Sequence, residues 1–336
     1  MRGAMRPTRL KRPKRPRRPT RSARSARSPR LALFGVCTAL LAMLGGTGIA
    51  AGAQQYPVPY TFSANVLAAV THPGSPPPGS NDWSCRPSAA HPRPVVLVHG
   101  LFANMTDNWQ TMSPLLANNG YCVFALTYGV APGATGPSNQ FGGLTPMEQS
   151  AAQLSAFVNR VLTATGARTV DIVGHSEGAT MPDYYIEYLG GAAKVTRYVG
   201  ISGVKHGTTL HGIGTLANEF GKLFPGAPDA VSGSCGSCQE FLVGSPYIAK
   251  IEARAPASRV IYTNIATRYD ELVSPYTSSF LVGPNVTNIT LQDHCALDFS
   301  DHLSIVSSPI TGRYMLNALD PAHARPPVCT LVLPAA

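Results

Sequence analysis

The stretch Thr169-Val-Asp-Ile-Val-Gly-His-Ser-Glu-Gly178 decides the fold of this chain. Its first five residues form an apolar, β-branched run, which is typical of a strand buried on both faces of a sheet. The pattern G-x-S-x-G follows at 174–178, and residues 179–189 read as a helix whose start is restricted by Pro182. A serine between a buried strand and a helix predicts a tight turn that exposes its hydroxyl above the sheet. Ser176 is therefore the candidate nucleophile, and a plain Gly/Ser turn is the competing interpretation.

The rest of the chain repeats this alternation of strand and helix. Thr145-Pro-Met-Glu148 has the pattern of a capping box with proline at the first helical position, and Gly166 predicts the end of that helix. A closing helix is expected over 309–319. Further strands are predicted at residues 95–98, 122–128, 197–202, 259–265 and 288–291. This order predicts an α/β fold, with a mostly parallel central sheet and helices on both faces.

Residues 1–53 have the features of a secretory signal peptide. Of the 27 Lys and Arg residues, 13 lie in residues 1–30, and no Asp or Glu precedes residue 54. An apolar run of about 14 residues follows, and Ala51-Gly-Ala53 has a small-x-small cleavage pattern. A membrane anchor is the competing interpretation, but a span needs roughly 20 apolar residues. A lipid anchor on Cys37 and a twin-arginine signal at Arg17-Arg18 are weaker alternatives.

Removal of this leader changes the charge of the chain. The net charge is +10 over all 336 residues, whereas residues 54–336 hold 14 basic and 17 acidic residues, a net charge of −3. A nucleic-acid partner is therefore not expected. Residues 54–93 are rich in Pro and Gly and predict an irregular entry segment, and residues 94–336 are expected to form one catalytic domain.

Six cysteines remain after the leader, which agrees with export to an oxidising compartment. They read as three disulfides, for which 15 pairings exist, and the C-x-x-C pair reads as a local staple rather than a redox or zinc motif. The six are Cys85, Cys122, Cys235, Cys238, Cys295 and Cys329.

An acyl-transfer serine needs an acid and a base, which follow it in the order serine, Asp or Glu, His in this type of fold. Asp270 comes just after a predicted strand, and Glu271 is its close rival. His302 lies on a loop before the last helix and is the candidate base; His294 is the other histidine late enough in the chain.

The oxyanion of such a reaction needs backbone N–H donors. We expect one from Glu177, the residue after the serine, and one from Leu101, with Phe102 as the neighbour that could replace it. No H-E-x-x-H or comparable cluster is present, so neither a metal nor a cofactor is expected. Calcium at Asp298 or Asp301 is an unsupported alternative.

Taken together, these motifs resemble the secreted bacterial triacylglycerol lipases and esterases of actinobacterial type, the lipase class 2 family. The resemblance covers nearly all of residues 81–329. It rests on Asn81-Asp-Trp-Ser-Cys85, Val95-Val-Leu-Val-His-Gly100, Asp171-Ile-Val-Gly-His-Ser176, His206-Gly-Thr-Thr209, Tyr269-Asp-Glu-Leu-Val-Ser-Pro275 and Asp301-His-Leu303.

This resemblance implies the α/β-hydrolase fold and a Ser176–Asp270–His302 triad acting on carboxylic esters. It also implies the disulfides Cys85–Cys122, Cys235–Cys238 and Cys295–Cys329. The residue after the nucleophile is more often Gln in such lipases, whereas this chain has Glu177. A carboxylate there is expected to raise the pKa of His302 and to shift the pH optimum upward.

Residues 206–257 form a long connection between two predicted strands, and we expect a small cap or lid insertion there. An apolar stripe at roughly helical spacing indicates either a lid that lines an acyl pocket or a helix packed on the core. The stripe comprises Leu210, Ile213, Leu216, Phe220, Leu223 and Phe224.

The sequence as a whole therefore predicts a secreted, monomeric serine ester hydrolase, with a triacylglycerol lipase placed ahead of a short-chain carboxylesterase. Its expected partner is a lipid or other ester, with transient contact at a lipid interface. A polyesterase or acyltransferase would use the same triad, and a catalytically silent secreted binding module is the alternative that is not an enzyme.

Overall fold

A computed structural model describes residues 55–209, 214, 218, 221–222 and 235–335. Its sheet has six strands in the order β2-β1-β3-β4-β5-β6, and every neighbouring pair is parallel. The mostly parallel sheet is thus confirmed, and the strand ends differ from the predicted ones by at most two residues. The strands are β1 (Val95–Val98), β2 (Val123–Leu126), β3 (Val170–His175), β4 (Val195–Ile201), β5 (Ile261–Ala266) and β6 (Val286–Thr290).

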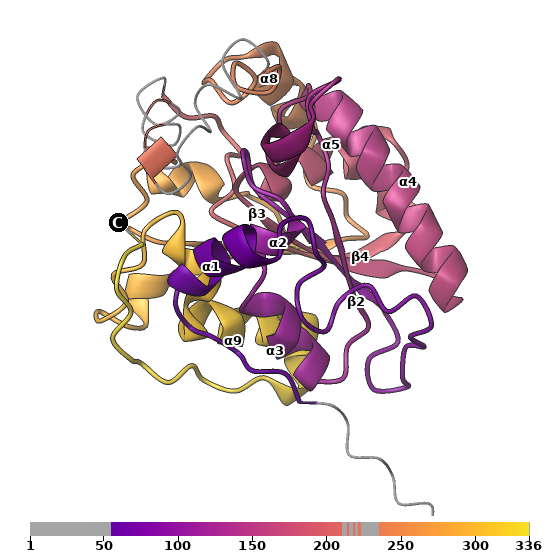
Figure 1. The fold of residues 1–336 in the computed structure, drawn as a ribbon. Helices are drawn as coiled ribbons and strands as arrows, with labels where there is room; N and C mark the ends of the chain where they lie inside the picture. Colours follow the sequence, from indigo (N-terminus) through magenta and orange to yellow (C-terminus); the bar gives the residue numbers. More distant parts are fainter. Residues whose placement is uncertain (1–54, 210–213, 215–217, 219–220, 223–234, 336) are drawn as a thin grey trace, which may run out of the picture. The chain divides into compact units, whose positions relative to one another are not determined.

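Helices cover both faces of this sheet (Figure 1). On one face, the side chains of α4 (Met147–Thr165), α5 (Met181–Tyr188) and α8 (Pro246–Glu252) form an apolar cluster with the strands. On the other face, α3 (Met112–Asn118) and α9 (Pro309–Leu319) do the same. Alternate residues of β1 belong to the two clusters, because successive side chains of a strand point to opposite faces.

Short helices mark the loops between these elements. A four-residue helix, α2 (Met105–Asn108), follows the loop after β1. The 3-10 helices are η1 (Gly136–Gln140), η2 (Ser176–Ala179), η3 (Gly191–Ala193), η4 (Tyr276–Ser279), η5 (Leu291–Asp293), η6 (Ser304–Ser307) and η7 (Pro321–His323).

The start of α4 differs from the predicted capping box. The cap residue is Pro146, which offers no side-chain oxygen, and the Thr145 hydroxyl is bonded to the Ser150 hydroxyl instead. A distant side chain performs the capping: the Met147 N–H donates to Glu240 Oε2 over 2.6 Å. Gly166 ends the helix in the left-handed conformation, as predicted.

The entry segment 54–93 is not irregular throughout, and this prediction was wrong. It contains a nine-residue helix, α1 (Ser63–Thr71). The sequence Ser-Ala-Asn-Val-Leu-Ala-Ala-Val-Thr has no polar face opposite an apolar one, and the neighbouring Pro/Gly run dominates the composition. The helical pattern was therefore missed.

The three disulfides implied by the resemblance are present: Cys85–Cys122, Cys235–Cys238 and Cys295–Cys329. The apolar stripe of the expected cap lies outside the described residues, so the cap stays a prediction. No helix in the described part of the chain is both long and apolar enough to cross a membrane.

Candidate active site

Ser176 occupies a strained turn between β3 and η2. Its backbone φ is +54°, in the left-handed region that side chains rarely adopt. A Cβ on Gly174 would lie 1.8 Å from the Gly178 carbonyl oxygen, and a Cβ on Gly178 would lie 2.0 Å from the Val98 carbonyl oxygen. Only glycine fits at either position, because backbone from neighbouring segments already occupies the space. The G-x-S-x-G pattern is therefore required by close packing of the turn.

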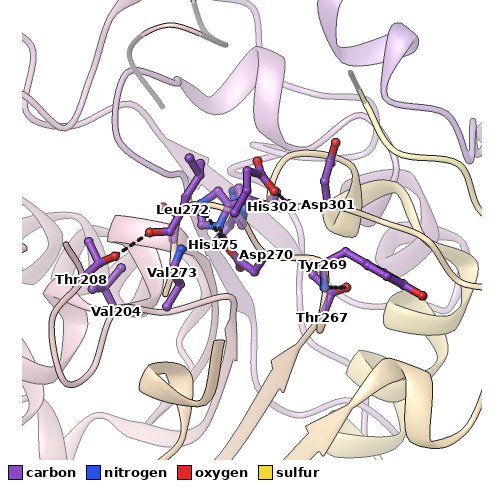
Figure 2. Close-up of polar contacts among 12 residues, drawn as sticks. His175, Val204, Thr208, Thr267, Tyr269, Asp270, Leu272, Val273, Asp301 and His302 are labelled. Atoms are coloured by element: carbon purple, nitrogen blue, oxygen red, sulfur yellow. Dashed lines mark hydrogen bonds and ion pairs between the residues drawn. The ribbon is translucent and has the colours of Figure 1, made fainter. Parts of the chain in front are cut away.

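His302 and Asp270 form a buried pair (Figure 2). The His302 Nδ1 lies 2.9 Å from both carboxylate oxygens of Asp270. The backbone N–H groups of Leu272 and Val273 also donate to Asp270 Oδ1, over 3.1 and 2.8 Å. The structure thus places Asp270 where it orients the imidazole, on the loop that follows β5.

The two rivals lie elsewhere. Glu271 is exposed, and its Oε2 accepts the backbone N–H of His302 over 3.3 Å rather than contacting the ring. His294 is exposed as well, and its ring packs against Tyr314 with 5.2 Å between centroids. Neither side chain is positioned as the acid or the base of a triad with Ser176.

Burial and pairing compete in setting the charges of this pair. Burial raises the pKa of Asp270, but the charge and hydrogen bond of His302 outweigh it, so that the pKa lies below its usual value. Burial lowers the pKa of His302, but the charge and hydrogen bond of Asp270 outweigh it, so that the pKa lies above its usual value. The pair therefore favours a carboxylate that stabilises an imidazolium.

A side chain of the His206–Thr209 motif supports the Asp270 loop. The Thr208 hydroxyl donates to the Leu272 carbonyl over 2.6 Å (Figure 2). The Ser274 N–H donates to the same hydroxyl oxygen over 3.3 Å. Thr208 thus fixes the backbone beside the two N–H groups that hold the Asp270 carboxylate.

Ser176 and His302 line one cavity together with Gly100, Leu101 and Phe62. They are not hydrogen-bonded to each other in this structure. His302 Nε2 is buried and has no hydrogen-bond partner among the described residues. Hydrogen bonds between a nucleophile and its base are often long before substrate binds. The free ring nitrogen is the one that can accept the proton of a serine in this cavity.

The loop after β1 lies against the serine. A Cβ on Gly100 would stand only 3.0 Å from the Cβ of Ser176. The Phe102 N–H donates to the Gly142 carbonyl over 2.9 Å and is thereby engaged. The Leu101 N–H has no acceptor within the described part of the chain and belongs to a residue that lines the cavity. The Glu177 N–H lies at the start of η2, where N–H groups lack partners within the helix.

A buried network behind the cavity was not foreseen from the sequence. The ring nitrogens of His175 lie 2.9 Å from the His302 carbonyl oxygen and 3.1 Å from Asn108 Oδ1. Asn108 Oδ1 also accepts the Gly100 N–H over 2.9 Å. Burial lowers the pKa of His175 to about 3, so the ring is neutral near pH 7. A neutral imidazole has a single N–H, so His175 donates to one of these two oxygens. These contacts bring together the serine turn, the loop after β1 and the His302 loop; Asn108 carries no sequence signal of this role.

Glu177 does not act on His302 as expected, and that prediction was wrong. Its carboxyl is fully buried beside Gly143, whose Cβ would stand 2.8 Å from Glu177 Oε2. The Tyr128 and Ser237 hydroxyls approach this carboxyl, but each donates to a backbone carbonyl instead, of His99 and Gly143. By the geometry, neither carboxyl oxygen then has a hydrogen-bond partner among the described residues, and burial raises the pKa of Glu177 well above its usual value. The charges that raise the pKa of His302 are Asp270, Glu271 and Asp301.

A strained serine turn at the end of a parallel strand, with a buried Asp–His pair on later loops, defines a protein of the α/β-hydrolase fold. The solved structure of Aspergillus fumigatus lipase B shares this fold with the chain, at a TM-score of 0.56 and 17% sequence identity. The match covers 75% of this chain and 57% of that chain. The α/β-hydrolase fold expected from the sequence is confirmed.

The family follows from the sequence match. The model of the family Lipase (class 2) matches residues 92–313, and the chain belongs to this family. Triacylglycerol lipases of Pseudarthrobacter phenanthrenivorans and Burkholderia plantarii are each 35% identical to it over 101 residues. Those residues are 29% of this chain and only 28% and 25% of the two relatives.

Proposed function

We propose that this protein hydrolyses carboxylic esters, with triacylglycerols as its substrate class, through an acyl-enzyme on Ser176. The observation that carries the proposal is the buried His302–Asp270 pair, whose free Nε2 belongs to the cavity lined by Ser176. The family and the names of the two relatives support an ester substrate.

The reaction proceeds in two half-steps. His302 Nε2 takes the Ser176 proton as the serine oxygen attacks the ester carbonyl carbon, and the Leu101 and Glu177 N–H groups stabilise the oxyanion. Asp270 holds the imidazole in the required tautomer and stabilises the imidazolium. The alcohol leaves with that proton. Water then attacks the acyl-enzyme with His302 again as base, which releases the acid and restores Ser176.

Apolar side chains of the cavity favour an acyl group as the part of the substrate that it receives. Phe62, Leu101, Leu303 and Val306 all line it beside Ser176 and His302. Contact with such side chains favours the hydrocarbon part of an ester, because transfer of apolar surface from water is favourable in proportion to its area.

Secretion is part of the proposal. Three disulfides within residues 85–329 are stable in an oxidising compartment. The basic leader and Ala51-Gly-Ala53 support a cleavage site near Ala53. N-terminal sequencing of the exported protein should then start near Gln54; a mature protein that retains residues 31–44 would contradict a cleaved signal peptide.

Two assays test the function. The first measures hydrolysis of p-nitrophenyl esters of increasing chain length, and the second measures hydrolysis of an emulsified triacylglycerol. The protein should hydrolyse long-chain as well as short-chain esters, and Ser176→Ala should be inactive. Activity that falls steeply beyond short acyl chains would make it a carboxylesterase. Equal activity in Ser176→Ala would reject the site, and an inactive parent protein would indicate a binding module.

A further inference from the structure

Helix α1 exposes two of its large apolar side chains and buries the polar side chain of Asn65. Leu67 and Val70 are 63% and 72% exposed, whereas Asn65 is fully buried. A surface helix ordinarily buries its large apolar side chains and leaves its polar ones in water. We call the exposed pair Leu67 and Val70 the α1 face.

Asn65 fixes this orientation by bonding to two loops of the active site. Its Nδ2 donates to the Ser307 hydroxyl over 3.1 Å, and its Oδ1 accepts the Gln110 N–H over 3.1 Å. Ser307 ends η6, shortly after His302, and Gln110 follows α2, shortly after Asn108. Rotation of α1 to bury Leu67 and Val70 would leave the Asn65 amide without these partners, and an unsatisfied buried polar group is unfavourable.

The helix also adjoins the catalytic cavity. Phe62, the residue that caps its N-terminus, lines the cavity that holds Ser176 and His302. Helix α1 therefore begins at the wall of the cavity that holds Ser176 and His302.

The charge of this region identifies the class of partner. Residues 54–81 contain no Asp, Glu, Lys or Arg. A segment that has exposed apolar side chains and no charges of its own fits a surface that is itself apolar and uncharged, whereas a nucleic acid or an acidic bilayer would be met by basic side chains.

We propose that α1 is the helix that binds the protein to the surface of neutral ester droplets, with Leu67 and Val70 inserted into the lipid. This inference rests on the proposed function, because it supplies the contact that brings insoluble esters to Ser176. The occupant is the lipid surface itself, and a second copy of the chain is the competing occupant.

Droplet binding by Leu67→Gln/Val70→Gln tests this proposal. Glutamine retains good helix propensity and removes apolar area, so α1 should remain folded. Binding to triolein droplets is measured by flotation, with all proteins carrying Ser176→Ala so that the droplets are not consumed. We expect about tenfold weaker binding in the double variant, from the loss of two partly inserted apolar side chains.

Val282→Gln is the matched control. Val282 is 91% exposed but lines a different hollow, beside Lys205 and His206. Its replacement should leave droplet binding unchanged and should show that the loss is specific to α1. With Ser176 present, the α1 variants should hydrolyse soluble p-nitrophenyl butyrate within about twofold of the parent, while hydrolysis of emulsified triolein falls about tenfold.

Three results would overturn the inference. Unchanged droplet binding in the double variant shows that α1 does not contact lipid. An equal loss in Val282→Gln shows that any exposed valine contributes. A parent protein that is dimeric by light scattering, with a monomeric double variant, assigns the α1 face to a second copy.

Leu67→Ala/Val70→Ala repeats the test if the glutamine variant loses soluble-ester activity. Absence of ester hydrolysis in the parent refutes the proposed function instead, and flotation still reports on α1.

Discussion

Asp270 and Glu177 are both buried carboxyl groups of one site, yet their pKa values move in opposite directions. Asp270 accepts two backbone N–H bonds and pairs with His302, and its pKa lies below the usual value. Glu177 has no hydrogen-bond partner among the described residues, and its pKa lies well above the usual value. Burial alone favours the neutral acid, and only compensating donors keep a buried carboxylate charged.

The difference separates two roles. In the proposed reaction, a charged Asp270 stabilises the imidazolium that forms on His302. The raised pKa of Glu177 favours a neutral side chain that fills space beside Gly143, while its backbone N–H is the one proposed to stabilise the oxyanion. The predictions below test this contrast, from the largest expected effect to the smallest.

Removal of His302 should have the largest effect, because it deprives Ser176 of its base and Asp270 of its partner. We expect His302→Ala to lower kcat by about 10⁵–10⁶. Breaking a buried pair by removing one partner costs roughly 3–5 kcal/mol. Esterase assays and urea unfolding measure the two effects.

The pH dependence of this stability loss follows from the directions of the two pKa shifts. The raised pKa of His302 stabilises the fold fully below 6.5, and this stabilisation is lost as the pH rises through the folded-state pKa. The lowered pKa of Asp270 stabilises the fold above pH 3.8, and this stabilisation is lost as the pH falls through the folded-state pKa of Asp270. The difference between parent and His302→Ala should therefore be greatest between these values. A difference that grows above pH 9 would contradict the pairing.

Replacement of the charged acid should have the next largest effect. Asp270→Asn should lower kcat by about 10⁴, because the amide no longer enforces the required tautomer. Activity of the parent should rise with pH as His302 becomes neutral, and this limb should move to lower pH in the variant, since the main charge that raises the His302 pKa is gone. Glu271→Gln is the control and should change kcat by less than about threefold. Equal losses of kcat in Asp270→Asn and Glu271→Gln would contradict the assignment of Asp270 as the acid of the triad.

Glu177→Gln should change activity least, by less than about threefold at pH 7, since the neutral acid and the amide are alike in charge and shape. It should raise stability at neutral and alkaline pH. The raised pKa of Glu177 means that its contribution to stability is lost as the pH rises above 4.5 toward the folded-state value, and glutamine has no such loss. Each kcal/mol gained raises Tm by about 2–4 °C in a domain of this size.

Thermal unfolding between pH 5 and pH 9 measures this gain. It should increase with pH. A Tm difference that does not depend on pH would show that Glu177 is charged in the folded protein, and the contrast with Asp270 would be lost.

Sequence reasoning was most successful where a short segment determines its own geometry. The strand, turn and helix around Ser176 are encoded by adjacent residues. The order of the chain left Asp270 or Glu271 as the acid and His294 or His302 as the base, and their places after a predicted strand and before the last helix favoured Asp270 and His302. It failed where the outcome depends on distant partners. The cap of α4 comes from Glu240, the orientation of α1 comes from Ser307 and Gln110, and the Glu177 carboxyl is directed by space beside Gly143.

Labelling by a fluorophosphonate tests the central claim most directly, because the probe reacts with a serine only when an adjacent base activates it. Peptide mapping by mass spectrometry should place one adduct on Ser176 of the parent, and His302→Ala should remain unlabelled although folded. An adduct on another residue, or equal labelling of Ser176 in the parent and in His302→Ala, would contradict the account.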